Sequence, residues 1–176
     1  MDELPDIPDL HRRFGRSSLG FAVITVSDRR DATTDRGGPV AREAIAGAGH
    51  TVVRATIVAD EVEAIRAAVD AAVDDAGCDV VVLTGGTGVA RRDVTPEAVR
   101  PLFERELPGF GELFRQLSFA EIGAAAMLSR ATAGTVRGRA VFLLPGSPAG
   151  VRLAMERLVL PEAGHLLAQA SAASTP

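Results

Sequence analysis

The sequence predicts an α/β fold, a three-layer αβα sandwich in which a mostly parallel sheet lies between helices. Short apolar runs rich in β-branched residues alternate along the chain with segments that have the spacing of amphipathic helices. The run at 79–84 shows no polar alternation, which is typical of a parallel strand covered on both faces. With 176 residues, 47% of them hydrophobic, the chain is long enough for one ordinary core and too short for two.

The first half of the chain predicts strands that alternate with helices. Gly37-Gly38-Pro39 opens the first helix, because proline fits the first helical position, and the breaker pair Gly47 and Gly49 ends it. In the second helix apolar residues recur on one face and charged residues lie on the other. The strands are expected at 19–26, 51–58 and 79–84, and the helices at 37–46 and 61–76.

The second half also alternates between the two kinds of element. Thr95 is the expected N-cap of a helix that has Pro96 in its first turn and runs toward Glu104. Most phenylalanines fall between 103 and 119; interior packing is the first interpretation, and a contact between subunits is the alternative. The segment at 127–136 is ambiguous, because Ser129-Arg130 and Gly134 interrupt what could be an edge strand. The other expected elements are a strand at 140–144, a helix at about 149–160 and a last helix, restarted by Pro161, to about Gln169.

A single domain is expected at 19–168, between an N-terminal tail at 1–18 and a C-terminal tail at 169–176. The N-terminal tail is acidic where a signal peptide would carry positive charge before an apolar segment. No apolar run approaches the length of a bilayer span. We therefore expect a cytoplasmic protein with no membrane partner.

Composition excludes several classes of function. A net charge of -4 without a basic stripe, and the absence of Trp and Tyr, argue against a nucleic-acid partner. All 19 basic residues are arginine, so no lysine is present for a P-loop or a Schiff base. The single Cys78 is expected to be a small packing residue, and the histidines His11, His50 and His165 are expected to be structural.

Two glycine-containing strings follow predicted strands and suit phosphate. Glycines after a strand let backbone N–H groups turn toward one point, where phosphate oxygens can bind. A dinucleotide fingerprint is excluded, because counting from Gly86 its third glycine position is occupied by Arg91. The two strings are Leu83-Thr84-Gly85-Gly86-Thr87-Gly88 and Pro145-Gly146-Ser147-Pro148.

Acidic residues follow the same strands. Asp28 and Asp60 each come directly after a strand, and Asp93 lies in the loop after the first glycine string. Each alone is more often a helix cap or part of a turn, but the carboxyl ends of parallel strands meet at one edge, where open α/β sheets bind ligands. Carboxylates beside a phosphate-shaped loop predict Mg²⁺ and, with arginines to stabilise charge, a transfer reaction at a nucleotide phosphate.

These residues resemble a known family, the molybdopterin adenylyltransferases of the MogA/MoaB type, which are related to the N-terminal domain of gephyrin and to a domain of the plant protein Cnx. The resemblance covers about residues 19–168, and the stretch at 118–123 is closer to MoaB than to MogA. It is carried by Val26-Ser27-Asp28-Arg29, the first glycine string, Arg92-Asp93-Val94-Thr95-Pro96-Glu97-Ala98, Pro108-Gly109-Phe110-Gly111-Glu112, Leu128-Ser129-Arg130-Ala131 and the Pro145–Pro148 string.

The resemblance implies a reaction and roles for individual residues. Molybdopterin would react with ATP and Mg²⁺ to give adenylyl-molybdopterin and pyrophosphate, before a separate insertase adds molybdenum or tungsten. Family members form trimers or pairs of trimers. By position, the catalytic and Mg²⁺-binding residues would be Asp60 and Asp93; the residues that bind nucleotide or pterin phosphate would be Ser27, Asp28, Thr84, Gly85, Gly86, Thr87 and Gly88; and Ser129, Gly146 and Ser147 would shape the pocket.

A second function, from a different class, is also consistent with the sequence. The chain could hold molybdopterin or assemble partners of the same pathway without consuming ATP. Since no large insertase segment or linker is attached, the enzyme is the favoured hypothesis. Release of pyrophosphate in the presence of ATP, Mg²⁺ and molybdopterin would separate the two functions.

Overall fold

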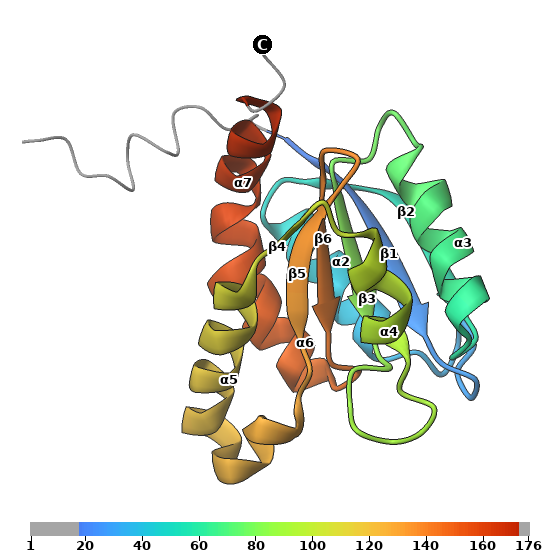
Figure 1. Ribbon diagram of the computed structural model, residues 1–176, viewed down its shortest axis with the longest axis vertical. Coiled ribbons are helices and arrows are strands. Elements are labelled where there is room, and N and C mark those ends of the chain that lie inside the picture. The colour runs from blue at the N-terminus through green and yellow to red at the C-terminus, as the bar shows by residue number, and fades with distance from the viewer. Residues whose placement is uncertain (1–17, 173–176) are drawn as a thin grey trace, which may run out of the picture.

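A computed structural model describes residues 18–172 and confirms the predicted three-layer αβα fold with a mostly parallel sheet (Figure 1). The six strands lie in the order β2-β1-β3-β6-β5-β4. Neighbours from β2 to β6 run parallel, whereas β5 is antiparallel to β6 and β4 is antiparallel to β5. The strands are β1 (Gly20–Val26), β2 (Thr51–Val58), β3 (Val80–Thr84), β4 (Arg105–Glu106), β5 (Thr132–Val136) and β6 (Arg139–Leu144).

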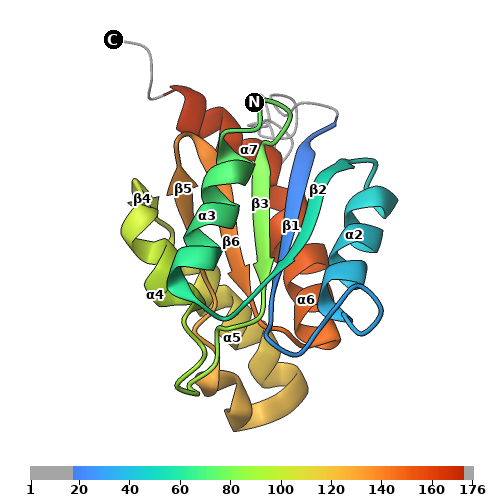
Figure 2. The same ribbon diagram turned by 90° about the vertical axis from the view of Figure 1, so that its right-hand side faces the viewer.

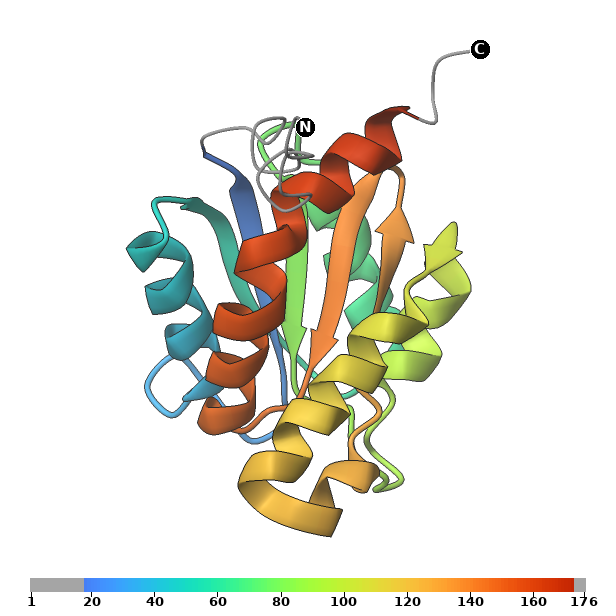
Figure 3. The same cartoon turned by 90° about the vertical axis from the view of Figure 1, so that its left-hand side faces the viewer.

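Helices cover both faces of the sheet. Helices α2 (Gly37–Gly47), α5 (Pro108–Ile122), α6 (Pro148–Ala154) and α7 (Leu160–Ala172) cover one face, as Figure 3 shows. The opposite face carries α3 (Val62–Val73) and α4 (Thr95–Val99), seen in Figure 2. Short irregular turns complete the chain, namely the 3-10 turns η1 (Arg100–Leu102) and η2 (Gly123–Leu128) and the π-helical turn η3 (Met155–Val159).

The central strands divide their side chains between two cores. Val80 and Val82 of β3 pack with α2, α5 and α6, while Val81 and Leu83 pack with α3 and α4. All four side chains are fully buried. This double burial accounts for the unbroken apolar run in the sequence, since neither face of the strand meets water.

The parallel strands all end at the same edge of the sheet. In Figures 1 and 2 this is the lower edge, where the loops after β1, β2, β3 and β6 gather. The segment η2 lies at the same end of the molecule. The topology therefore brings together the sequence-distant loops that carry the predicted site residues.

The region between β3 and β5 differs from the prediction. The helix expected to run toward Glu104 ends at Val99, continues as η1, and is followed by the short strand β4, which the sequence analysis missed. Because β4 pairs outside β5, the ambiguous segment at 127–136 contains a strand that is second from the edge, and its interpretation as an edge strand was wrong. Thr95 is the first residue of α4 rather than its N-cap, since its hydroxyl donates to the Gly85 carbonyl, 2.8 Å away.

The C-terminal helices also differ. Pro161 does not restart a helix, because α6, η3 and α7 follow one another without a break. The wider turn η3 ends at Val159, two residues before Pro161, so the helix changes its hydrogen-bond spacing next to a proline, which has no N–H to donate. Helix α7 continues to Ala172, beyond the expected end near Gln169, and the N-terminal tail falls almost entirely outside the described residues.

The single residues that were expected to be structural are so. Cys78 is fully buried, and its burial raises the pKa of the thiol. The ring of His50 stacks on Phe21 and accepts the Leu19 N–H, while His165 hydrogen-bonds within α7; His11 lies outside the described residues. No helix among residues 18–172 is both long and apolar enough to span a membrane.

Candidate functional site

The loops after β1 and β2 are joined by a reciprocal pair of hydrogen bonds. The N–H of Asp28 donates to Asp60 Oδ2 over 3.1 Å, and the N–H of Asp60 donates to Asp28 Oδ1 over 3.0 Å. The free oxygen of Asp28 forms an ion pair with Arg92, which comes from the loop after β3. Three loops that are remote in sequence therefore meet at these two carboxylates.

The glycine string brings the end of β3 against the same point. Gly85 has φ +105° and Gly86 has φ +64°, conformations that favour glycine. A Cβ atom at Gly85 would lie 2.4 Å from the Val26 carbonyl oxygen, and one at Gly86 would lie 3.2 Å from Asp60 Oδ1. Glycine at both positions thus allows the loop backbone to reach the end of β1 and the Asp60 carboxylate.

Asp93 folds back onto the loop that carries it. Its Oδ2 accepts the N–H of Ala90 over 2.8 Å, and its own N–H donates to the Ala90 carbonyl. The same Oδ2 lies 2.7 Å from where a Cβ at Gly88 would stand. The loop after β3 therefore has Asp60, from the loop after β2, beside Gly86, and its own Asp93 beside Gly88.

Asp60 is the electrostatic centre of this group. Its burial raises its pKa above the ordinary aspartate value, and the charges of Asp28 and Asp93 raise it further, against the opposing effects of the Asp28 N–H and Arg92. Carboxylates crowded in this way, with a shifted pKa, mark a candidate functional site.

The other predicted residues lie close to this centre. Thr84 is buried below the start of α2, and Gly146 packs against Gly85, with 3.3 Å between a Cβ placed at Gly146 and Gly85 Cα. Ser27 accepts the N–H of Arg29, and the hydroxyl of Ser147 caps α6 by accepting the N–H of Gly150 over 3.2 Å. These contacts hold the loops in shape.

Ser129 and Ser147 line a small hollow of about 110 Å³ whose remaining walls are mainly apolar. It lies between the end of α5 with η2 and the start of α6. Its other polar lining residues are Ser118 and Glu121 of α5, and one of its walls is the Pro145–Ser147 turn, which packs against the glycine loop through Gly146. The apolar walls include Phe114, Ile122, Ala125, Ala126 and Leu153.

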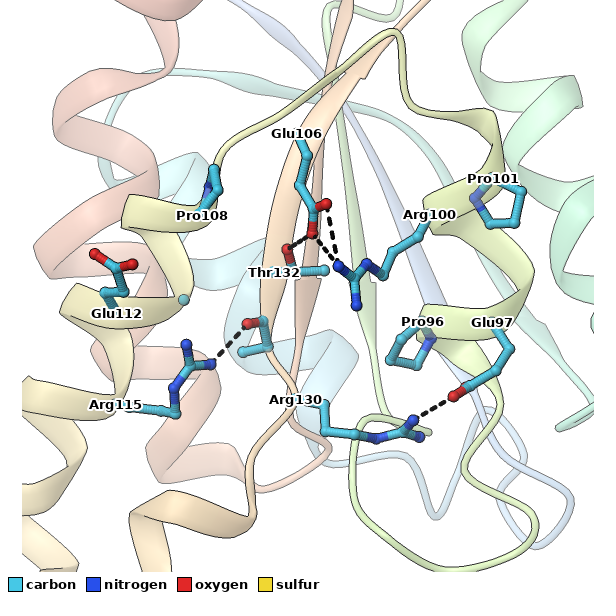
Figure 4. Close-up of a pocket in the computed structure, with 12 residues that line it drawn as sticks. Pro96, Glu97, Arg100, Pro101, Glu106, Pro108, Glu112, Arg115, Arg130 and Thr132 are labelled. Atoms are coloured by element: carbon cyan, nitrogen blue, oxygen red, sulfur yellow. Dashed lines mark hydrogen bonds and ion pairs between the residues drawn. The ribbon is translucent and has the colours of Figure 1, made fainter.

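A wider hollow of about 440 Å³ lies between α4 and α5, and its lining does not include Asp28, Asp60 or Asp93 (Figure 4). Its charged side chains are largely paired with one another: Arg100 with Glu106, and Arg130 with Glu97. Arg115 donates to the carbonyls of Ser129 and Ala131. This hollow contains none of the predicted catalytic residues.

The arginines near the site divide into two groups. Arg92 and Arg130 are bound within the protein, Arg92 to Asp28 and Arg130 to Glu97 and loop carbonyls. Partial burial acts to raise the pKa of Glu97, but the hydrogen bond and charge of Arg130 outweigh it, and the pKa is lowered. The exposed side chains of Arg29 and Arg91 have no hydrogen bond or ion pair within residues 18–172.

Sequence analysis missed the roles of Arg130 and Asp35. The Asp35 carboxylate accepts the N–H groups of Gly37 and Gly38, so the start of α2 already binds an anion from its own chain. A polar residue two positions before a glycine pair was a usable signal for Asp35. Arg130 was marked by its place in the Leu128–Ala131 string, but nothing local indicated its partner, since its contact with Gly88 spans 42 residues.

The donor set suits a hard cation that arrives with its ligand. Within the described residues no group of three or more His, Cys, Asp or Glu side chains could hold a metal ion by itself. Asp60 and Asp93 offer carboxylate oxygens, the atoms that Mg²⁺ prefers, and Mg²⁺ commonly takes one or two carboxylates with substrate phosphates. The residues present therefore fit such an ion only if phosphate oxygens complete its shell.

Comparison with known proteins identifies close relatives. Residues 22–165 match the family model described as "Probable molybdopterin binding domain". The chain is 50% identical to "Molybdenum cofactor biosynthesis protein B" of Bacillus subtilis (strain 168) over 158 residues, 89% of this chain and 93% of that protein.

Solved structures agree. A crystal structure of molybdenum cofactor biosynthesis protein B is 46% identical with a TM-score of 0.85, and the match covers 88% of this chain and 97% of that chain. The structure of the tungsten cofactor synthesizing protein MoaB from Pyrococcus furiosus is 41% identical with a TM-score of 0.79, covering 87% of this chain and 97% of that one.

Proposed function

The chain belongs to the MoaB/MogA family of molybdenum cofactor biosynthesis proteins, and from this premise we propose that it transfers AMP from ATP to molybdopterin, in an Mg²⁺-dependent reaction that releases pyrophosphate. One observation carries the proposal. Asp60 lies beside Gly86 and Asp93 lies beside Gly88, so the glycine loop after β3 carries a carboxylate next to each of two glycines. A binding module would not require two such carboxylates at a phosphate loop.

The proposed step exchanges one phosphorus–oxygen bond for another. An oxygen of the molybdopterin phosphate attacks the α-phosphorus of ATP, the bond from that phosphorus to the oxygen bridging to the β-phosphorus breaks, and pyrophosphate leaves with the bonding electrons. The attacking phosphate oxygen is already ionised near neutral pH, so no general base is required. Catalysis then depends on position and on the neutralisation of charge.

The residues of the chain have separate tasks in this step. The glycine loop binds phosphate oxygens through its backbone N–H groups, and Asp60 and Asp93 would hold Mg²⁺. Bound Mg²⁺ neutralises phosphate charge and orients the phosphates. Arg29 and Arg91 are the arginines available for phosphate, because Arg92 is bound to Asp28.

The hollow beside Ser129 and Ser147 is the proposed place of the pterin. Its apolar walls suit a flat ring, and one wall is the Pro145–Ser147 turn, which packs on the glycine loop through Gly146. Ser27 and Asp28 border the phosphate side through the loop after β1. A ligand bound in this way would bring its phosphate toward Gly86 and Gly88.

The test measures pyrophosphate release by the purified protein with ATP, Mg²⁺ and molybdopterin. Wild type is expected to turn over, and Asp93→Asn is expected to lose at least about 100-fold in rate, because one of the two carboxylates that would hold Mg²⁺ is removed and the ion neutralises the phosphate charge. Asp74→Asn, the same change at a surface ion pair with Arg137, serves as control and should keep full activity. Molybdopterin binding without pyrophosphate release would instead establish the non-catalytic binding function.

The surroundings of the reaction follow from the same proposal. The product would pass to a separate protein that inserts molybdenum or tungsten, in the cytoplasm. A homotrimer or homohexamer is the proposed assembly. It is supported by the large apolar side chains that remain exposed at the end of α5 and in η2, since such patches mark contacts between subunits.

A further inference from the structure

We propose that Arg130 is a positioning residue, which holds the loop bearing Asp93 in the shape that the site requires. The inference rests on the proposed function, because the loop in question is the one proposed to bind phosphate and Mg²⁺. Arg130 does not contact the proposed ligands; it acts through the backbone on which Asp93 stands.

Residue 130 donates to three carbonyl groups of this loop. Its backbone N–H donates to the Thr87 carbonyl over 2.9 Å, its Nε to the Gly88 carbonyl over 2.7 Å, and its Nη2 to the Asp93 carbonyl over 2.5 Å. Gly88 and Asp93 bracket the exposed tip of the loop, and the Asp93 carbonyl belongs to the residue whose carboxylate enters the site. One side chain therefore sets both ends of the tip.

The remaining arm of the guanidinium is anchored on a helix. Nη1 pairs with Glu97 of α4, as Figure 4 shows, while the backbone of residue 130 leads into β5. The guanidinium of Arg130 thus connects the loop to α4 and to the start of β5. Lysine could not replace it, because an ammonium is a point charge without the planar fork that makes parallel bonds to separate acceptors.

Few other contacts restrain this part of the loop from outside. Thr95 bonds to Gly85 and Gly86 at the loop's start, and Arg92 pairs with Asp28 near its end. Val89, Ala90 and Arg91 at the tip are exposed. Loss of the Arg130 side chain would therefore free the segment between Gly88 and Asp93 while leaving the sheet intact.

The experiment compares Arg130→Ala and Arg130→Lys with wild type, using Arg100→Ala as the matched control. Arg100 lines the same hollow and pairs with Glu106, but it does not touch the loop (Figure 4). Two quantities are measured, amide hydrogen exchange of residues 87–93 and the Mg²⁺ concentration that half-saturates pyrophosphate release. Loss of an outer partner of a metal site commonly costs about 10–100-fold in affinity.

In Arg130→Ala we expect exchange of the loop amides and the half-saturating Mg²⁺ concentration both to rise by about tenfold. Arg130→Lys should fall between Arg130→Ala and wild type, and Arg100→Ala should match wild type. A purely structural role would lower the melting temperature but leave the Mg²⁺ requirement of the folded protein unchanged. If Arg130→Ala does not fold, Arg130→Lys and Glu97→Gln carry the comparison.

Unchanged loop exchange, or faster exchange with an unchanged Mg²⁺ requirement, would overturn the inference. If wild type releases no pyrophosphate, the proposed function fails separately, and the affinity for MgATP measured by calorimetry replaces the rate. Weaker MgATP binding by Arg130→Ala than by Arg100→Ala would then still support the positioning role. Equal affinities, or no MgATP binding by wild type, would overturn it.

Discussion

At the scale of single residues, the Asp60 carboxylate lowers the stability of the fold when ionised, although the proposed reaction requires it. Its carboxylate is partly buried beside Asp28 and Asp93, and its raised pKa shows that the fold disfavours its charge. Asp60→Asn keeps an oxygen that can accept the Asp28 N–H while removing the repulsion. We expect AMP transfer to fall by at least about 100-fold while the free energy of unfolding stays equal or rises by less than about 1 kcal/mol, since such charges are screened by solvent.

Pyrophosphate release and thermal unfolding in EDTA measure the two effects. Asp74→Asn is again the control, because it changes the same group in an exposed ion pair. A variant that unfolds more easily than wild type would contradict the repulsion argument, and one that retains full turnover would contradict the catalytic role.

Asp31 supplies a dependence on pH. Hydrogen bonds from the Thr33 hydroxyl, the Thr34 hydroxyl and both N–H groups lower the pKa of Asp31 to about 2. A carboxylate with a depressed pKa contributes stability that is fully present above its ordinary value of 3.8 and is lost as pH falls through about 2. In the folded protein Asp31 should therefore stay ionised, with its threonine hydrogen bonds in place, at pH 3.5 and take up its proton only near pH 2.

An NMR titration of the Asp31 carboxyl measures this value. Thr33→Val removes the hydroxyl that lowers the pKa most, so the pKa should return part of the way to 3.8. Thr33→Ser keeps a hydroxyl and should keep the low value. Identical titrations for the valine and serine variants would show that the hydroxyl is not the cause.

At the scale of elements, the junction between β3 and its loop depends on a left-handed backbone. Gly85 has φ +105°, and an added Cβ would stand 2.4 Å from the Val26 carbonyl of the neighbouring strand. Gly85→Ala should lower the free energy of unfolding by about 2 kcal/mol or more, because strain and a backbone clash coincide. Chemical denaturation measures the loss.

Gly47 provides the matched control at the end of α2. Nothing lies within 4 Å of a Cβ placed there, and alanine favours a helix over glycine by up to about 1 kcal/mol. Gly47→Ala should therefore be neutral or slightly stabilising. Equal changes in the free energy of unfolding at both positions would mean that the close contact between Gly85 and the Val26 carbonyl does not cause the destabilisation.

The loop after β3 also explains why the prediction of Thr95 as the N-cap of α4 was wrong. Thr95 has the residue type of an N-cap, yet its hydroxyl is used to bind the glycine loop. The long-range bond satisfies a buried carbonyl, while at the start of α4 the Thr95 N–H is already bonded to the Gly86 carbonyl and Pro96 has no N–H that needs a cap. A local pattern cannot reveal such competition.

At the scale of the whole molecule, one apolar surface is left uncovered. We define the α5–η2 surface as Leu113, Phe119, Ile122, Met127 and Leu128, of which Phe119 is 63% and Met127 is 76% exposed. Phe110 and Phe114 of the same segment are buried, which confirms core packing for these two, while Phe119 faces outward. The alternative of a contact between subunits therefore applies to the far end of α5.

The expected result is a trimer or hexamer for wild type and a smaller species for Phe119→Ser with Met127→Ser, since polar groups remove the apolar area that drives association. Light scattering after size exclusion measures the mass. Val89→Ser, at a 68% exposed position in the loop after β3, is the control. A double variant with the wild-type mass would place the subunit contact elsewhere.

The amino-acid sequence by itself determined the layers, the parallel strands and the gathering of Asp28, Asp60, Asp93 and the glycine string at one edge. These depend on local patterns, because burial on both faces leaves an apolar run and a strand end is marked by glycine or a polar residue.

Only the tertiary structure decided which charged side chains already have hydrogen-bond or ion-pair partners within the protein. Asp28 binds Asp60 across 32 residues, and Arg130 reaches Gly88 across 42. Arginine has the same local signature whether it contacts a ligand, a carboxylate or a carbonyl, since its partner is chosen by the packing of distant segments. For the same reason β4, two residues long, is a strand only because β5 lies beside it.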